Sequence, residues 1–371
     1  MLGEIYPFLS AEKVDIFLVI CYNEAEKQRR LVMSDKIRGC LVGGAVGDAL
    51  GYPVEFLQDF TIFKRYGEAG ITEYTLTDGT AIVSDDTQMT LFTAEGLLRA
   101  RKKFVKPTVD DYIEEIYKSY LDWLKTQSTD FDPTAAHPRS ELLGIAALFK
   151  PRAPGTTCLS ALSSGRCGTL DYRINNSKGC GGVMRVAPIP LMLAGSSYLT
   201  PDDVDMIAAR ASAITHGHEL GYVSSAFLSR IIVELLGGAD IRAAVDSARR
   251  NMKKNFGESD LVTYFDTKIA KALHLASDTD VDTLDAIREL GEGWVAEETV
   301  AIAVYCSLRF SRDFENAVIA AVNHSGDSDS TGAVTGNILG AYLGYSAIPE
   351  KFITNLEFKD ILLDFADRLA R

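Results

Sequence analysis

Two short acidic segments hold the side chains best suited to chemistry in this chain. The first is Ser84-Asp85-Asp86-Thr87, and the second is Asp327-Ser328-Asp329-Ser330-Thr331. Capping of a helix N-terminus explains one acid in each segment. It does not explain the acids crowded beside it, because neighbouring carboxylates raise one another's pKa unless a cation intervenes. Carboxylate and hydroxyl oxygens suit Mg²⁺, Mn²⁺ or Ca²⁺ rather than zinc, so each segment could supply half of a two-ion centre.

Two glycine rows lie beside these acidic segments and indicate how they are positioned. The rows are Gly39, Gly43, Gly47 and Gly51, and Gly332, Gly336, Gly340 and Gly344. A spacing of four places each row on one helix face. Every glycine costs a helix about 0.5–1 kcal/mol relative to alanine, so close packing between crossing helices must return the loss. The interspersed Asp48 and Asn337 indicate buried helices of a soluble protein, and we expect Asp48 to accept hydrogen bonds from backbone or hydroxyl donors.

Helical periodicity dominates the rest of the chain, and convincing strand pairs are hard to find. The stretches with this periodicity are 84–101, 109–125, 201–214, 222–236, 295–310 and 332–345. No segment is long or biased enough to serve as a flexible linker. The sequence therefore predicts one all-α domain.

Composition excludes several classes of function. The chain has 371 residues, 47% of them hydrophobic, and a formal net charge of -13, which argues against nucleic acid as a partner. The apolar run 16–21 is too short to cross a bilayer, and no export signal precedes it. The six cysteines lack Cys-x-x-Cys spacing, so we expect reduced thiols in a cytoplasmic protein.

The N-terminal residues 1–33 differ in pattern from the rest of the chain and are predicted to be an extension of a domain over residues 34–371. An apolar patch at 14–19 is followed by a charged run at 24–30. One interpretation is a helix or strap packed on the domain surface. The other is an arm that binds a partner protein.

Five motifs, in order along the chain, resemble those of the ADP-ribosylglycohydrolase family, which includes the dinitrogenase reductase-activating glycohydrolases. They are GCLVGGAVGDALGYPVEF at 39–56, SDDT at 84–87, KGCGGVMRVAP at 178–188, TH at 215–216 and NHSGDSDSTG at 323–332. The resemblance spans residues 39 to about 344 and leaves the first 33 outside it. It implies an orthogonal multi-helix bundle around a cleft with two Mg²⁺ ions, or Mn²⁺ in their place.

The resemblance also assigns metal ligands within the acidic segments. By position in the motifs these ligands are Ser84, Asp85, Asp86, Asp327, Asp329 and Ser330. Serine stands at positions 84 and 330 where threonine is commoner, and it still presents a hydroxyl oxygen. We assign catalytic roles to Asp86, Asp327 and Glu55. Pro53 should end the preceding helix at Gly51 or Tyr52, leaving Glu55 on a loop from which it can move a proton; the competing interpretation of Glu55 is a surface or capping residue.

A glycine-rich loop is the expected platform for the diphosphate and ribose of the substrate, since dense glycines let backbone N–H groups approach phosphate closely. The residues assigned to substrate binding are Gly179, Cys180, Gly181, Gly182, Met184 and His216. His216 could instead be a core or capping residue. Arg185 could face the diphosphate or form a buried ion pair.

The implied function is Mg²⁺-dependent release of ADP-ribose from modified proteins, with arginine as the expected acceptor. Such an enzyme could protect against an ADP-ribosylating toxin. An alternative is an inhibitory protein whose residues 1–33 block an ADP-ribosyltransferase partner. A third interpretation is a hydrolase of small ADP-ribose derivatives.

Overall fold

A computed structural model describes the backbone from residue 11 and the side chains from residue 27 to the end of the chain. The described part contains sixteen α-helices and one two-stranded ribbon, so the all-α prediction is confirmed. The helices are α1 (Ala11–Gly51), α2 (Asp59–Tyr66), α3 (Asp85–Lys103), α4 (Val109–Ser128), α5 (Thr156–Ser163), α6 (Pro188–Leu193), α7 (Pro201–Ala213), α8 (Glu219–Leu236), α9 (Ile241–Phe256), α10 (Asp260–Ser277), α11 (Thr283–Leu290), α12 (Ala296–Arg309), α13 (Phe314–Val322), α14 (Ser328–Leu343), α15 (Glu350–Ile353) and α16 (Lys359–Leu369). Strands β1 (Leu76–Thr77) and β2 (Thr80–Ala81) are antiparallel, with Leu76 opposite Ala81.

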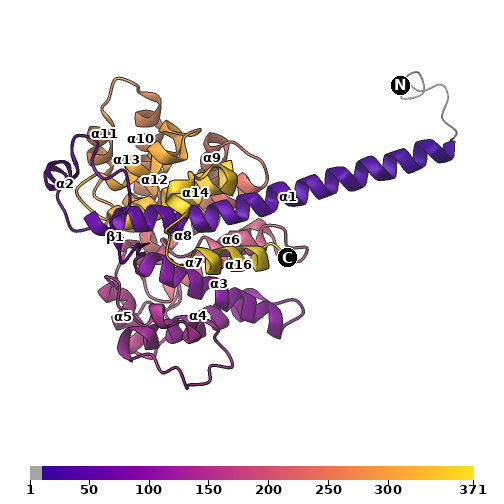
Figure 1. Ribbon diagram of the computed structural model, residues 1–371, viewed down its shortest axis with the longest axis horizontal. Coiled ribbons are helices and arrows are strands. Elements are labelled where there is room, and N and C mark those ends of the chain that lie inside the picture. The colour runs from indigo at the N-terminus through magenta and orange to yellow at the C-terminus, as the bar shows by residue number, and fades with distance from the viewer. Residues whose placement is uncertain (1–10) are drawn as a thin grey trace.

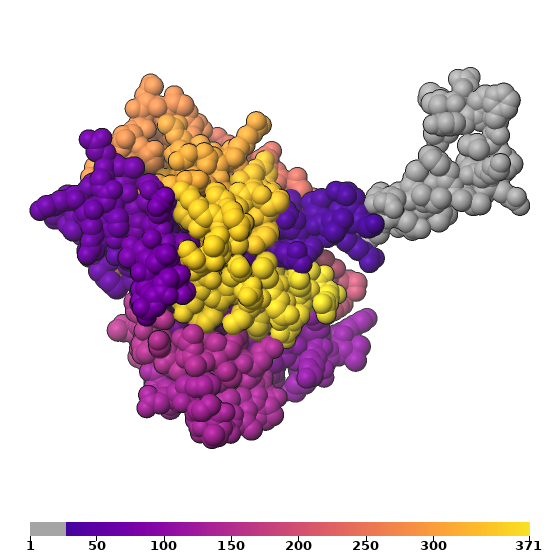
Figure 2. Space-filling model, in the orientation of Figure 1, coloured from indigo at the N-terminus to yellow at the C-terminus, as the bar shows by residue number. Residues whose placement is uncertain are grey.

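Helix α1 runs through the whole molecule and its N-terminal part extends beyond it (Figure 1). Helices α9 to α14 lie on one side of α1, and α3 to α5 lie on the other. Figure 2 shows the C-terminal segment, in yellow, filling the face between these two groups. Among the described residues no helix has both the length and the apolar run that crossing a bilayer requires.

The two glycine rows pack directly on each other. A Cβ added to Gly43 would lie 2.5 Å from the carbonyl oxygen of Gly336, and one added to Gly47 would lie 2.0 Å from that of Gly332. Residue numbers rise along α1 as they fall along α14, so the helices are antiparallel. The close packing expected of the glycines is therefore a contact between the two rows, a pairing that their spacing alone does not predict. Both helices are buried along this contact.

The C-terminal end of α1 and the start of α14 meet beside the acidic segments. Helix α1 ends at Gly51, as Pro53 predicted, and the short 3-10 helix η1 (Tyr52–Val54) follows. Helix α14 begins at Ser328, four residues before the predicted start at 332, because the Asp327 side chain caps it by accepting from the Ser330 N–H. The acids of both segments thus lie at helix starts.

Asp48 ties α1 to the first acidic segment. Its carboxylate accepts hydrogen bonds from the Ser84 N–H at 2.9 Å, from the Thr87 N–H at 3.0 Å, and from the Thr87 hydroxyl. This confirms the predicted role for Asp48 and positions the start of α3. The cysteines Cys40, Cys158, Cys167, Cys180 and Cys306 are free thiols, whereas Cys21 lies outside the described side chains.

We predict that Gly47→Ala destabilises the fold, because its Cβ would lie 2.0 Å from the Gly332 carbonyl oxygen. Relief of this overlap would require the two helices to move apart and so to lose the close contact between the glycine rows. The expected loss is about 1–3 kcal/mol or more in the free energy of unfolding. Urea denaturation followed by circular dichroism measures it. Gly144→Ala is the matched control, since an added Cβ there meets nothing within 4 Å; equal stability of the two variants would contradict the packing argument.

Candidate metal centre

The first acidic segment forms the N-terminus of α3. The Ser84 hydroxyl accepts from the Asp86 N–H at 3.1 Å and acts as the N-cap. Asp85 and Asp86 fill the first turn and are buried, and the Asp85 carboxylate also accepts from the Gly155 N–H at 3.2 Å. Two buried carboxylates therefore stand side by side at one helix start.

The second acidic segment is held by the loop that precedes α12. The Asp327 N–H donates to the Glu292 carbonyl at 2.8 Å. Gly326 has φ 141°, and a Cβ there would lie 1.9 Å from the Glu292 carbonyl oxygen, so only glycine fits. Asp327 and Asp329 are each 3% exposed. The backbone thus presents these two carboxylates in a single buried turn.

The two segments converge, although more than 240 residues separate them. The Ser330 hydroxyl donates to the Asp86 carboxylate at 2.9 Å. Glu55, carried by the chain just after η1, brings a third element to the same place. Carboxylate oxygens of Glu55, Asp327 and Asp329 lie within 4.8 Å of one another. This is close enough for all three to bind one metal ion.

A cavity of about 350 Å³ opens over these carboxylates. Five of the six predicted metal ligands line it, namely Asp85, Asp86, Asp327, Asp329 and Ser330. Ser84 does not, because its hydroxyl is buried as the cap of α3. The loop that precedes α5 contributes Ala153, Pro154 and Gly155 to the lining.

The electrostatics of this cavity favour a bound cation. Burial, followed by the charges of Asp329, Asp327 and nearby acids, raises the pKa of Glu55 to about 10. Burial and the Asp329 charge raise the pKa of Asp48 to about 7 and that of Asp86 well above its usual range. Among the described residues, no Lys or Arg forms an ion pair with any of these acids. The Oε2 atom of Glu55 is buried and has no hydrogen-bond partner in the described part.

These observations indicate that the buried acids bind a divalent ion. Without a cation the site must take up protons, and one Glu55 oxygen stays without a partner. The oxygen-only donor set matches the ligands that Mg²⁺ and Mn²⁺ prefer. Glu55 is 8% exposed, which argues against the surface or capping role considered for it.

The predicted substrate platform lines the same cavity as the acids. Gly179, Cys180, Gly181, Met184 and His216 line it, whereas Gly182 packs against Ser212 beneath the surface. The Cys180 thiol donates to the Asp327 carboxylate, so this loop is in direct contact with the acidic turn. The fold thus brings residues predicted to bind substrate together with the acids.

His216 is buried and uncharged. Burial and the nearby Arg185 charge lower the pKa of His216 to about 3, and its Nδ1 lies 2.8 Å from the Thr215 hydroxyl. Arg185 itself does neither of the two things expected of it. It is buried away from the cavity, donates to the Thr215 hydroxyl at 2.6 Å, and places its guanidinium 4.3 Å from the centre of the Tyr120 ring. A cation–π contact replaces the expected ion pair.

Two aromatic residues at the cavity were not found from the sequence. Phe56 and Trp294 line its mouth with their rings stacked. The position of Phe56 directly after Glu55 was the only available signal, because 17 Phe and 15 Tyr gave no basis for choosing among the aromatics.

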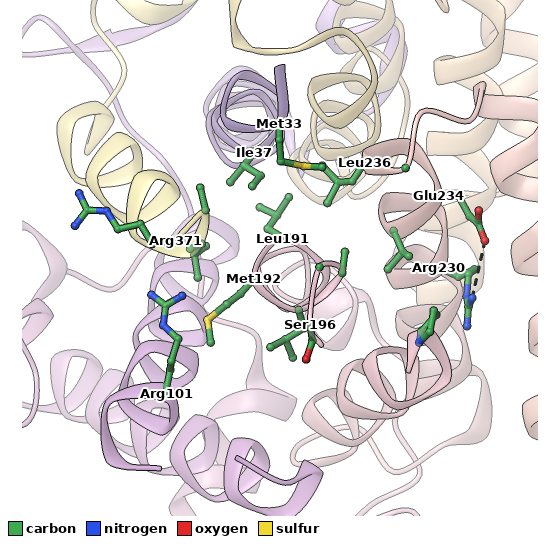
Figure 3. A pocket seen from close by; sticks show the side chains of 18 of the residues that line it. Met33, Ile37, Arg101, Leu191, Met192, Ser196, Arg230, Glu234, Leu236 and Arg371 are labelled. Carbon is green, nitrogen blue, oxygen red and sulfur yellow. Dashed lines mark ion pairs between the residues drawn. The ribbon is translucent and has the colours of Figure 1, made fainter. Parts of the chain in front are cut away.

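A second cavity, of about 570 Å³, shares no lining residue with the acidic cavity and lies between α1, α6, α8 and the C-terminus (Figure 3). Met33, Ile37, Leu191 and Leu236 point into it, and its charged groups stand at the edges. It has no cluster of titratable side chains comparable to that of the smaller cavity. The acidic cavity is therefore the candidate centre.

Comparison with known proteins agrees with this geometry. The profile described as ADP-ribosylglycohydrolase matches residues 29–371. The chain belongs to the ADP-ribosylglycohydrolase family. It is 26% identical to the ADP-ribosyl-[dinitrogen reductase] glycohydrolase of Rhodospirillum rubrum, covering 88% of this chain and 91% of that protein. It is 24% identical to the human ADP-ribosylhydrolase ARH3, covering 87% of this chain and 89% of that one.

The fold is that of the family as well. A solved structure titled ADP-ribosylglycohydrolase-related protein complex aligns with a TM-score of 0.60 at 23% identity, covering 91% of this chain and 98% of that one. The suspected family is thus confirmed, and family membership and the named relatives support ADP-ribosyl hydrolase activity.

We predict that, without divalent ions, the free energy of unfolding falls as pH rises from about 5.5 to about 8.5. Asp48 and Glu55 have pKa values of about 7 and about 10 in the folded protein. In the unfolded chain such groups lose their protons near pH ~4, so the folded state binds more protons across this range and loses stability as they dissociate. The expected loss is on the order of a few kcal/mol.

Thermal unfolding at a series of pH values measures this effect, with and without Mg²⁺. Added Mg²⁺ should raise Tm most at the alkaline end, where the carboxylates are charged. A Tm that rises with pH in the presence of a chelator would contradict this account of the cluster.

Proposed function

We propose that the protein is a Mg²⁺-dependent hydrolase that releases ADP-ribose from modified proteins, with arginine as the acceptor. The single observation that carries the proposal is the convergence of the acidic segments of α3 and α14 beside the glycine loop. Mn²⁺ has the same ligand preferences and could serve in place of Mg²⁺. The free thiol of Cys180 at the site fits a reducing compartment, so we place the enzyme in the cytoplasm.

The proposed division of labour follows from where the residues lie. Asp85, Asp86, Asp327, Asp329 and Ser330 would hold the ions, and Ser84 would act mainly by fixing the turn. Two bound divalent ions would supply a water of lowered pKa and charge stabilisation at the ribose. The reaction forms a bond from water oxygen to ribose C1, breaks the bond from C1 to the acceptor nitrogen, and returns a proton to that nitrogen.

Glu55 is the proposed proton carrier. It lines the cavity, and its buried Oε2 has no hydrogen-bond partner among the described residues. A protonated carboxyl in this position can give its proton to the departing group, as a general acid does. Asp86 and Asp327 would orient the ions and the attacking water through their ligating oxygens.

The glycine loop would hold the rest of the substrate. Gly179, Cys180 and Gly181 expose backbone at the cavity wall, where N–H groups can approach a diphosphate. His216 is neutral, so it would contribute a hydrogen bond rather than a positive charge. Arginine is favoured as the acceptor because the site is acidic and a relative is named for a modified protein, dinitrogen reductase.

We expect release of free ADP-ribose from an arginine-ADP-ribosylated protein in the presence of Mg²⁺ and its loss with EDTA. Asp329→Ala should reduce kcat at least ~100-fold, because it removes a ligand from the shared turn. Glu55→Gln should lower kcat about 10²–10⁴-fold while the Mg²⁺-induced rise in Tm persists. Chromatographic measurement of ADP-ribose provides the readout.

Asp364→Ala is the matched control for these variants, since Asp364 is an exposed acid on α16 that pairs only with Arg368 among the described residues. Full activity in EDTA would reject the metal-dependent mechanism. Loss of the Tm rise in Glu55→Gln would make Glu55 a metal ligand instead. Turnover of free ADP-ribose derivatives but not of modified protein would favour the small-molecule hydrolase.

A second proposal concerns the N-terminal part of α1. The helix is continuous from Ala11 into the domain, and residues 27–32 are exposed, with Leu31 57% and Val32 47% exposed. We propose that this extension binds a partner, an ADP-ribosyltransferase toxin being the expected one, and that the protein confers protection against it. The residues before 11 lie outside the described part of the chain.

Deletion of residues 1–32 should abolish capture of the transferase while leaving release of ADP-ribose unchanged. The exposed position of 27–32 explains why the domain should tolerate the deletion. Pull-down of the purified transferase by the full chain and by the truncated chain measures the difference. Equal capture by both would remove the extension from the mechanism.

A further inference from the structure

The cavity between α1, α6, α8 and the C-terminus takes no part in the proposed function. Its volume of about 570 Å³ lies within the range of small-molecule sites, which are typically about 300–1,000 Å³ and lined mostly by apolar side chains with a few polar groups. Buried aliphatic side chains, each at most 6% exposed, line it: Ile37, Leu191, Leu193, Leu236 and Leu369. This lining suits the apolar part of a ligand.

One end of this cavity is positively charged. Arg101, in the last turn of α3, and Arg371 lie on the same side of it (Figure 3). Arg101 donates to the Arg368 carbonyl at 2.6 Å, which caps the C-terminal end of α16 and uses one of the five guanidinium N–H groups. Arg368 itself pairs with Glu141 and Asp364. Arg101 forms no ion pair with an acid in the described part of the chain, so its charge is uncompensated.

Two tyrosine hydroxyls lie near the Arg101 guanidinium. The hydroxyls of Tyr112 and Tyr198 are 2.8 Å apart and share one hydrogen bond, and both tyrosines line the cavity. Each hydroxyl carries one hydrogen, so this bond leaves one hydrogen free to be donated. Burial and the positive charges of Arg368 and Arg371 lower the pKa of Arg101, and a nearby anion would oppose that effect. A bound anion could therefore accept hydrogen bonds from both the guanidinium and the tyrosine pair.

The opposite end of the cavity has no uncompensated cation. Arg230 pairs there with Asp202 and Asp205, each at 2.7 Å. Its guanidinium also lies 3.9 Å from the Glu234 carboxylate. The charge distribution therefore matches an elongated apolar molecule with a negative group at one end. A carboxylate is the group that best fits a guanidinium, because it can accept two parallel N–H···O bonds.

We propose that this cavity binds a free long-chain carboxylate, with its carboxylate at Arg101 and its hydrocarbon chain against Leu191 and Leu236. The site is separate from the acidic cavity, with which it shares no lining residue. Ile37 of α1 precedes the first glycine of the row by two residues, so the ligand would contact α1 where that row begins. Because the ligand would bind only the folded chain, it should also raise Tm.

Calorimetric titration of the full chain compares dodecanoate with two matched probes. Decanoate lacks two CH₂ groups and should bind about 15-fold more weakly, since each buried CH₂ is worth about fourfold in affinity. Dodecyltrimethylammonium has the same chain length with a positive head, and it should bind at least ~10-fold more weakly than dodecanoate. Equal affinity for the two heads would overturn the assigned role of the cation. Absence of saturable dodecanoate binding would reject the site.

Arg101→Met keeps an unbranched side chain without the charge and should weaken dodecanoate binding about 10- to 100-fold. Arg101→Lys should retain the affinity within about tenfold. Arg312→Met is the matched control, since Arg312 is exposed and does not line the cavity. Circular dichroism verifies that each variant is folded. Unchanged affinity in folded Arg101→Met would contradict the proposed head-group contact.

Methionine methyl resonances locate the ligand on the wild-type chain, independently of the stability of any variant. Met33 and Met192 line the proposed site, whereas Met184 lines the acidic cavity. Dodecanoate should shift the resonances of Met33 and Met192 in a saturable manner and leave that of Met184 unchanged. Met252, buried in α9 and outside both cavities, is the reference. A shift of Met184 with none at Met33 or Met192 would place the ligand in the acidic cavity and defeat the proposal.

Discussion

The antiparallel contact between the glycine rows of α1 and α14 is the constraint on which the rest of the structure depends. At this contact the backbones approach so closely that a Cβ at Gly47 or Gly336 would lie within about 2 Å of a carbonyl oxygen on the facing helix. The contact fixes the position of α14 along the axis of α1. It therefore also sets where Asp327 and Asp329 stand relative to Glu55 at the end of α1. A shift along the row would separate acids whose oxygens now lie within 4.8 Å.

A second interaction carries the same constraint to α3. Asp48 stands within the glycine row of α1, and its carboxylate holds the Ser84 and Thr87 N–H groups. One helix thus positions both acidic segments, the first through Asp48 and the second through the glycine contact. The cost is a concentration of buried negative charge with no ion-pair partner among the described residues. A bound cation would offset this buried negative charge, and the oxygen donors of the site match a hard divalent ion.

The acidic cavity combines carboxylates, a glycine loop and two aromatic rings. Gly179, Cys180 and Gly181 bring backbone groups to its wall, and His216 lies beside them. Phe56 and Trp294 line the same cavity with their rings stacked. Hydrogen bonds from the Cys180 and Asp327 N–H groups join the loop that carries Trp294 to the glycine loop and to the acidic turn.

The amino-acid order alone determined the helical class, the family, the acidic segments and the end of α1 at Gly51, because these depend on local spacing, on proline geometry and on contiguous motifs. It also predicted that Asp48 would accept hydrogen bonds from backbone donors, since a carboxylate buried between packed helices needs such partners. The packing of the two glycine rows on each other and the cation–π contact of Arg185 with Tyr120 depend on contacts between distant segments. So does the pairing of Phe56 with Trp294, which lie far apart in the chain and share no periodic pattern. Only the folded chain decides such contacts, because a side chain's neighbours across the molecule are set by how helices pack and not by the residues adjacent to it.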